Sequence, residues 1–310
     1  MYKINVLIVT YKQADVIGRN IESILQQKDY GLNKIVICDD CSPDNNWEVI
    51  QSYANKYPEY IEAYRNETNL GIYGNSDRLV TLRGEADLFC WLEGDDALCD
   101  GFFKYSQDYI KHNAIDLNLP IGIFSDYCVI NPQGEKYVVK NDFVLRGESP
   151  LGAYYRNIAT WRASLFSRSV IEQFQPVESG KGLILEETLF DSQWFKYIKQ
   201  AFYNPIVGSI YYSGIGVSVQ WGLCDNDSSY KVDDNIVRWQ YMIDNGIICD
   251  KIDIFWAYKN IAYSSCLKIF SWKNLFLNVF YYYKGLKGYR KNIKRVILET
   301  RSLIMSRSKS

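Results

Sequence analysis

Glu93-Gly94-Asp95-Asp96 is the densest group of carboxylates in this sequence with a spacing suited to binding a cation. Mg²⁺ and Mn²⁺ prefer hard oxygen ligands and need only one or two protein carboxylates when phosphates and water complete their coordination. A cation held in this way stabilises the charge of a departing diphosphate. An ordinary turn is the alternative, because Asp and Gly are common in turns. Glu93, Asp95 and Asp96 are therefore candidate metal ligands.

A second acidic pair, Asp39-Asp40, follows another apolar run. A carboxylate at the end of a strand can accept hydrogen bonds from a base N–H or a ribose hydroxyl. Helix capping is the alternative, with Ser42 as N-cap and Pro43 at the first helical position. The sequence does not decide which of the two aspartates would contact a base.

Both acidic groups stand where predicted strands end. Residues 1–100 alternate short apolar runs with segments of helical spacing, such as Ile17, Ile21 and Ile24. This order predicts an α/β fold with a doubly wound, mostly parallel sheet. The predicted strands are Ile4–Val9, Lys34–Cys38, Tyr60–Tyr64 and Leu88–Leu92, and a loop with Gly71 and Gly74 should lead into a helix over Ser76–Arg83.

Ligands of such sheets bind beyond the carboxyl ends of the strands. Thr10-Tyr11, Asp39-Asp40 and the segment 93–96 all directly follow predicted strands, so we expect one cleft to collect their side chains. Glycine-rich phosphate loops of the G-x-G-x-x-G and G-x-x-x-x-G-K-[ST] types are absent from the sequence, which argues against a dinucleotide fingerprint and a P-loop.

Composition excludes other kinds of site. The single histidine, His112, makes a histidine-based triad improbable, and Cys38 and Cys41 have no second pair to complete a zinc site. The absence of a visible signal peptide and of an apolar run near the ~18 residues that span a bilayer predicts a cytoplasmic protein.

Six segments, taken together, resemble the family 2 glycosyltransferases, which have the GT-A fold. The first four are VLIVTYKQADVIGRNIESILQQ, KIVICDDCSPD, NLGIYGN and FCWLEGDDAL, and the looser two are TWRASLFSRSVIEQF and LILEETLFDSQWFKYI. The resemblance implies an inverting transfer from a nucleotide-sugar, usually a UDP-sugar, to a glycan or lipid-linked acceptor, with Mn²⁺ or Mg²⁺. It also implies a catalytic domain over 1–225, with a nucleotide-binding half (1–100) and an acceptor half (101–225).

The resemblance carries roles onto matching positions. Thr10, Tyr11, Asp39 or Asp40, Asn69, Gly71 and Asp95 would bind the nucleotide, and Asp95, Asp96 and Glu93 the metal, although many members have Asp where Glu93 stands. Glu186-Glu187-Thr188 occupies the place of a Glu-Asp-Thr segment, so Glu187 would be the general base, with Asp191 as second choice. Trp161, Arg162, Glu186, Ser218 and Trp221 would lie near the acceptor or donor sugar.

Residues 226–310 are predicted to form a helical extension. Its last part, 251–310, contains 13 Lys/Arg and only two acidic residues beside many aromatic ones. That pattern fits helices at an anionic membrane surface, or alternatively helices packed on the catalytic domain or in an oligomer; nucleic acid is the least favoured partner. Two other functions stay open: a nucleotidyltransferase, and a catalytically inactive subunit that binds nucleotide-sugars.

Overall fold

The computed structural model describes residues 1–155, 157–177, 183–215, 229–248 and 257. The chain divides into two units, Met1–Asp227 and Ser228–Ser310, and each is described by itself. In the second unit, the described part is mainly the helix α10 (Ser229–Asp244). Most of the predicted basic extension, including all of 258–310, lies outside the described residues.

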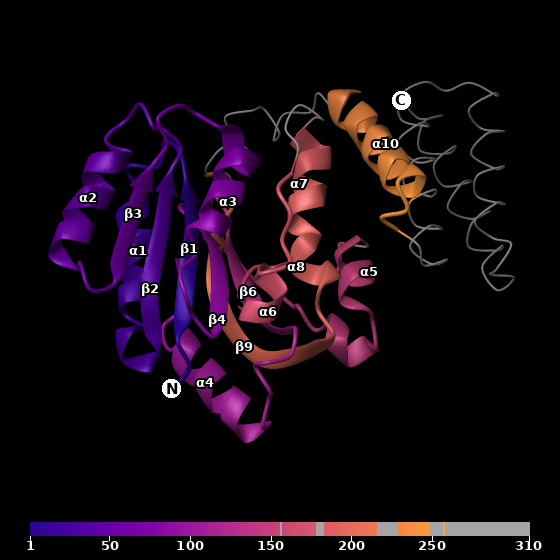
Figure 1. Cartoon of the computed structure of the whole chain (residues 1–310), viewed down its shortest axis with the longest axis horizontal. Coiled ribbons are helices and arrows are strands. Elements are labelled where there is room, and N and C mark those ends of the chain that lie inside the picture. The colour runs from indigo at the N-terminus through magenta and orange to yellow at the C-terminus, as the bar shows by residue number, and fades with distance from the viewer. Residues whose placement is uncertain (156, 178–182, 216–228, 249–256, 258–310) are drawn as a thin grey trace, which may run out of the picture. The chain divides into compact units, whose positions relative to one another are not determined.

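A mixed, nine-stranded sheet is the framework of the first unit (Figure 1). Its strand order is β3-β2-β1-β4-β8-β6-β9-β5, with β7 beside β6. Neighbours among the first four strands of this order run parallel, as do β6 and β9, whereas the other pairs are antiparallel. The strands are β1 (Ile4–Thr10), β2 (Leu32–Asp39), β3 (Ile61–Arg65), β4 (Leu88–Glu93), β5 (Ala97–Leu98), β6 (Ile121–Ile130), β7 (Lys136–Val139), β8 (Ser164–Ser167) and β9 (Gln200–Tyr212).

Helices cover both faces of this sheet, which is why β1 is buried along its whole length. Ile4, Val6 and Ile8 pack into a cluster with α1, α2 and α4, whereas Leu7 and Val9 pack into a second cluster with α3 and the helices between residues 150 and 196. The helices are α1 (Ile17–Leu25), α2 (Asn46–Lys56), α3 (Gly71–Thr81), α4 (Phe102–His112), α5 (Pro150–Tyr155), α6 (Arg168–Ile171), α7 (Leu183–Asp191) and α8 (Gln193–Lys196), with 3-10 turns η1 (Lys28–Tyr30) and η2 (Phe143–Arg146).

Strand register brings the polar strand ends together. Thr10 of β1 is paired with Asp39 of β2, and Val9 is paired with Glu93 of β4. Because all three strands are parallel, their carboxyl ends lie at one edge of the sheet. The α/β fold class predicted from the sequence is confirmed, and this edge is where a ligand would be expected.

Two predicted helix starts were wrong. Helix α2 begins at Asn46 and not after Ser42, because the Ser42 N–H donates to the Asp39 carboxylate at 3.0 Å and its hydroxyl accepts from the Lys12 N–H. Helix α3 begins at Gly71, although its glycines predicted a loop. The Asn69 side chain accepts from the Gly71 N–H at 2.9 Å, and this local hydrogen bond helps to start the helix despite the low helix propensity of glycine.

Strand β9 runs from Gln200 to Tyr212 and includes Pro205. Its register with β6 shifts between the pairs Phe124–Tyr203 and Asp126–Val207. Pro205 falls within this bulge, where a residue without an N–H does not interrupt the ladder of hydrogen bonds.

Within the part of the chain that the structure describes, no helix is both long and apolar enough to cross a bilayer.

Candidate active site

A cleft of about 820 Å³ opens beyond the carboxyl ends of β1, β2 and β4. It is lined by most of the site residues predicted from the sequence: Thr10, Tyr11, Asp40, Asn69, Gly71, Glu93, Asp95, Trp161, Arg162, Glu187 and Asp191. Asp39, Asp96 and Glu186 do not line it. Ser218 and Trp221 lie outside the described residues. The cleft therefore joins residues from both predicted halves of the domain.

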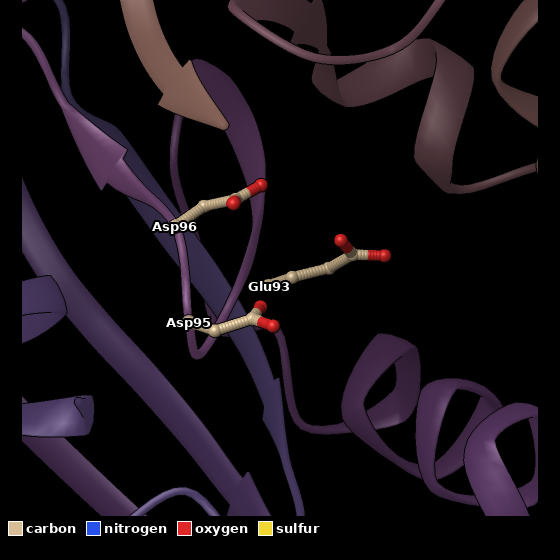
Figure 2. Close-up of side chains that lie close together, drawn as sticks. All are labelled: Glu93, Asp95 and Asp96. Carbon is tan, nitrogen blue, oxygen red and sulfur yellow. The ribbon is translucent and has the colours of Figure 1, made fainter. Parts of the chain in front are cut away.

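Three carboxylates meet at the end of β4. One oxygen from each of Glu93, Asp95 and Asp96 lies within 4.8 Å of the other two. Figure 2 shows the three side chains extending from the loop toward the same space. Asp95 and Asp96 are buried and Glu93 is half-buried. Among the residues that can be described, this is the one acidic group with a spacing suited to a metal ion.

Helix α1 holds this loop through the loop's own backbone. The Asn20 amide donates to the carbonyl oxygens of Glu93 at 2.8 Å and of Asp96 at 3.0 Å. Arg19 donates to the carbonyl oxygen of Asp95 at 2.6 Å, and its guanidinium lies over the Tyr212 ring. Helix α1 thus holds the loop through its backbone carbonyls, while the Asp96 carboxylate accepts a hydrogen bond from the Tyr212 N–H of β9 at 3.3 Å.

Gly94 is required by close packing and not by an unusual backbone angle. A Cβ atom at this position would lie 2.3 Å from the Gln13 side-chain oxygen and 2.9 Å from the Thr10 Cβ. The Gly94 N–H donates to the Val9 carbonyl at 3.1 Å, so the backbone of the loop lies directly against the end of β1. The contact between the ends of β1 and β4 therefore requires glycine at position 94.

The electrostatics of the cluster favour an added cation. Burial, together with the charge of Glu93, raises the pKa of Asp95 to about 7. Burial also raises the pKa of Asp96 well above its usual range, against the opposing effect of Arg162. A divalent cation would relieve the repulsion among these carboxylates, and an all-oxygen donor set suits Mg²⁺ or Mn²⁺. The residues present therefore fit a divalent metal ion.

Asp39 and Asp40 have different surroundings, although the sequence left their roles open. The Asp39 carboxylate is fully buried, accepts from the Asn46 amide at 2.7 Å and lies 3.4 Å from the Arg65 guanidinium. Asp40 reaches the cleft wall, where its Oδ1 accepts from the Asn66 amide and the Leu70 N–H. Of the two aspartates, Asp40 therefore lines the cleft and Asp39 does not.

Helix α7 supplies the acidic residues on the opposite wall. Glu187 is exposed and Asp191 is half-buried, and both line the cleft one helical turn apart. The pKa of Asp191 is raised well above its usual range by burial and by the charge of Glu187, while a hydrogen bond from Trp161 opposes the shift. Glu186, the neighbouring acid, does not line the cleft.

Several residues of the site were not predicted from the sequence. Arg19 and Asn20 lie on a helix whose apolar spacing was recognised, but nothing in that spacing identified their contacts with a loop over 70 residues away. Six other cleft residues were not singled out from the sequence either: Gln13, Tyr73, Asn75, Trp91, Phe190 and Tyr211. Their position after strands or on helices facing the carboxyl edge is the signal that could have identified them.

Comparison with known proteins agrees with this geometry. Residues 5–141 match the family described as Glycosyl transferase family 2. An uncharacterised glycosyltransferase of Mycoplasma genitalium is 29% identical over 170 residues, which are 50% of this chain and 54% of that protein. The chain covers only 28% of the length of three mycobacterial relatives that it matches at 30% identity.

Two solved structures share the fold across nearly the whole chain. Residues 1–349 of Staphylococcus aureus TarS, in complex with UDP-GlcNAc, align with a TM-score of 0.54 and 13% identity, covering 94% of this chain and 92% of that one. A mannosyltransferase of Pyrobaculum calidifontis, in complex with GDP-Man and Mn²⁺, aligns with a TM-score of 0.52 and 13% identity, covering 99% and 86%. At this identity the likeness establishes the GT-A fold alone.

Proposed function

We propose that this chain, a member of glycosyl transferase family 2 through residues 5–141, transfers a sugar from a nucleotide-sugar to an acceptor hydroxyl with inversion at the anomeric carbon. One observation carries the proposal. A single cleft joins the Glu93–Asp95 carboxylates, the Asp40 strand end and the α7 acids Glu187 and Asp191. Such a cleft can hold a charged leaving group on one wall and an acid–base residue on the other.

The donor would bind along the carboxyl edge of the sheet. Asp40, with Thr10, Tyr11, Asn69 and Gly71 nearby in the cleft, would hold the nucleoside. Mn²⁺ or Mg²⁺, held by Asp95, Asp96 and Glu93, would supply Lewis-acid stabilisation of the diphosphate when bound. A UDP-sugar is the favoured donor by family resemblance, and the TarS complex contains UDP-GlcNAc.

The acceptor would approach from the α7 wall. A sugar hydroxyl is a poor nucleophile at neutral pH, so a base must take its proton as it attacks the anomeric carbon. Glu187 is exposed at the cleft and is our first choice for that base. Asp191, whose raised pKa favours its protonated form, is the second choice. Trp161 would orient this wall through its hydrogen bond to Asp191.

Binding and turnover together test the proposal. A thermal-shift screen of nucleotides and nucleotide-sugars, with and without Mn²⁺, should show stabilisation by one nucleoside diphosphate that increases with the metal. The wild type should hydrolyse the donor or transfer its sugar, and Asp96→Ala should abolish this activity while circular dichroism shows that the fold is retained. That result would support the proposed enzymatic function. Wild-type turnover in Asp96→Ala would remove the assigned metal role.

Two alternatives are separated by the same assays. A catalytically inactive binding subunit would bind a nucleotide-sugar but release no sugar with Mn²⁺. A nucleotidyltransferase would form the nucleotide-sugar from a nucleoside triphosphate and a sugar phosphate. The family match favours glycosyl transfer over both.

The composition of residues 251–310 suggests where in the cell the enzyme would act. Their 13 basic residues would attract an anionic leaflet, and their aromatic residues would sit at its interface, which would place a cytoplasmic enzyme beside lipid-linked acceptors. Co-sedimentation with liposomes of anionic and of neutral lipid, for the full chain and a truncation ending at Asp250, tests this. Equal binding by both proteins would contradict the membrane role.

A further inference from the structure

Arg162 places a protein cation inside the acidic cluster. Its Nη2 donates to the Glu93 carboxylate at 2.8 Å, and its Nε lies 3.6 Å from the Asp96 carboxylate. Two of the three candidate metal ligands are therefore already paired with a positive charge. Arg162 also lines the cleft, so the same guanidinium faces the space that a donor would occupy.

The Arg162 guanidinium is fixed in position by its neighbours, but one of its hydrogen-bond donors has no acceptor. It lies between two aromatic rings, 4.7 Å from the centre of Trp161 and 4.3 Å from that of Tyr211. Only 21% of its side chain is exposed, yet its buried Nε makes no hydrogen bond. A buried arginine with an unused donor can gain a hydrogen bond when an anionic ligand arrives.

A divalent cation would need the oxygens that Arg162 now contacts. Two positive groups cannot both lie against Glu93 and Asp96 without repulsion, which is strong in a partly buried site. A diphosphate changes this balance, because a planar guanidinium binds phosphate oxygens through two parallel N–H donors. The arginine would thus exchange carboxylate partners for phosphate partners.

We propose that Arg162 is an internal counter-cation that competes with the divalent metal for Glu93 and Asp96, and that it is released to the donor diphosphate when metal and nucleotide bind together. This inference rests on the proposed function, since it needs the acidic cluster to bind a metal. The arginine would make tight metal binding conditional on the nucleotide. It would also offset the negative charge of the buried carboxylates when the cleft holds neither metal nor nucleotide.

Two binding measurements with opposite expected signs test the inference. Mn²⁺ affinity is measured by calorimetry on the full chain without nucleotide, and UDP affinity is measured with Mn²⁺ present. Arg162→Gln should bind Mn²⁺ at least ~5-fold more tightly than wild type and UDP at least ~5-fold more weakly, the lower end of typical coupling between sites. A residue that merely supports the fold would weaken both ligands.

Arg162→Lys provides a second variant that keeps the charge. A lysine has no planar fork and competes less well, so Mn²⁺ affinity should rank Gln, Lys, wild type from tightest to weakest, with UDP in the reverse order. Should Arg162→Gln not fold, the Lys variant decides alone by the same comparison. Arg146→Gln is the matched control, because Arg146 pairs with Asp142 at 3.1 Å and is not part of the cleft lining.

The outcomes separate this inference from the proposed function. If the Arg162 variants bind Mn²⁺ no more tightly than the wild type, and the wild type transfers sugar, then only the counter-cation role of Arg162 is overturned. No Mn²⁺ binding by wild type or variants, even with UDP, overturns the metal site and the inference together. Tighter Mn²⁺ and weaker UDP binding in the variants, with Arg146→Gln unchanged, supports it.

Discussion

The side-chain amide of Asn20 donates a 3.0 Å hydrogen bond to the backbone carbonyl of Asp96, and it also reaches the carbonyl of Glu93 at 2.8 Å. Asn20 is fully buried and belongs to α1, whereas its acceptors are the last residue of β4 and a residue of the loop that follows. A residue that does not line the cleft thus sets the shape of the wall that carries the acidic cluster.

Asn20→Ala should therefore weaken both the fold and the site. The Asp96 carbonyl would lose this donor, while the Glu93 carbonyl would still accept from the Asp96 N–H at 3.0 Å, and the loss costs about 1–3 kcal/mol of unfolding free energy. Urea denaturation measures that loss, and calorimetry should show weaker Mn²⁺ binding. Asn113→Ala is the control, since Asn113 donates to the Tyr109 carbonyl on an exposed surface. Unchanged stability and Mn²⁺ affinity in Asn20→Ala would contradict the role of the amide.

Gly94→Ala should disrupt the same loop by crowding. The added Cβ would meet Gln13 and Thr10 at distances well below normal contact, and overpacking of this kind costs about 1–3 kcal/mol. We expect loss of transfer and of Mn²⁺ binding with only partial loss of stability. Gly134→Ala is the comparison: its φ of +81° makes alanine strained, but nothing lies within 4 Å. Equal activity in the two variants would contradict the packing argument.

Asp39 and Asp40 should respond differently to the same substitution. Asp39→Asn disturbs a fully buried network with Asn46 and Arg65, so unfolding free energy should fall by about 1–3 kcal/mol. Asp40→Asn keeps an oxygen for the Leu70 N–H, so its larger effect should be on UDP affinity. Chemical denaturation and calorimetry on both variants check this. A greater loss of UDP affinity in Asp39→Asn would reverse the assignment.

Glu187→Gln should slow transfer without weakening donor binding. Removal of a general base typically costs about 10²–10⁴-fold in rate, because the acceptor hydroxyl keeps its proton. Single-turnover assays give the rate, and calorimetry gives UDP affinity. Glu186→Gln is the neighbouring control outside the cleft lining. If Glu187→Gln is active and Asp191→Asn is not, the base is Asp191.

Asp77 should make stability depend on pH. Burial raises its pKa to about 6, while its hydrogen bond from the Val177 N–H, 2.7 Å long, opposes the shift. The unfolded value is about 3.9, so the contribution to stability is present below ~pH 4 and lost as pH rises through ~6. The melting temperature of wild type relative to Asp77→Asn should therefore fall from pH 4 to 8. Asp108→Asn, at an exposed position, is the control variant.

Sequence patterns predicted the strands better than the contacts between elements. Buried apolar runs located β1, β2 and β4, because parallel strands covered on both faces are apolar throughout. The start of α3 was missed because the Asn69 side chain accepts a hydrogen bond from the Gly71 N–H, which helps to start the helix despite the low helix propensity of Gly71 and Gly74. This bond is local, but it involves a polar side chain outside the helix, which apolar periodicity does not encode.

The site was predictable to the extent that it follows strand ends. Asp40, Glu93 and Asp95 face the cleft because parallel strands end together. The choice between Asp39 and Asp40 was not predictable, because it depends on which carboxylate Asn46 and Arg65 hold inside the protein. The pairing of Arg162 with Glu93 joins positions 69 residues apart and had no local signal.

The hydrogen bonds from α1 to the main-chain carbonyls of the acidic loop also affect how the sequence of this loop could change in evolution. Since Arg19 and Asn20 hold the acidic loop through its backbone, the side chains at positions 93 and 95 can be exchanged while the loop keeps its path. Asp96 is different, because its carboxylate accepts a hydrogen bond from the Tyr212 N–H at 3.3 Å. New cation preferences could therefore arise by single substitutions in a loop whose architecture is inherited unchanged.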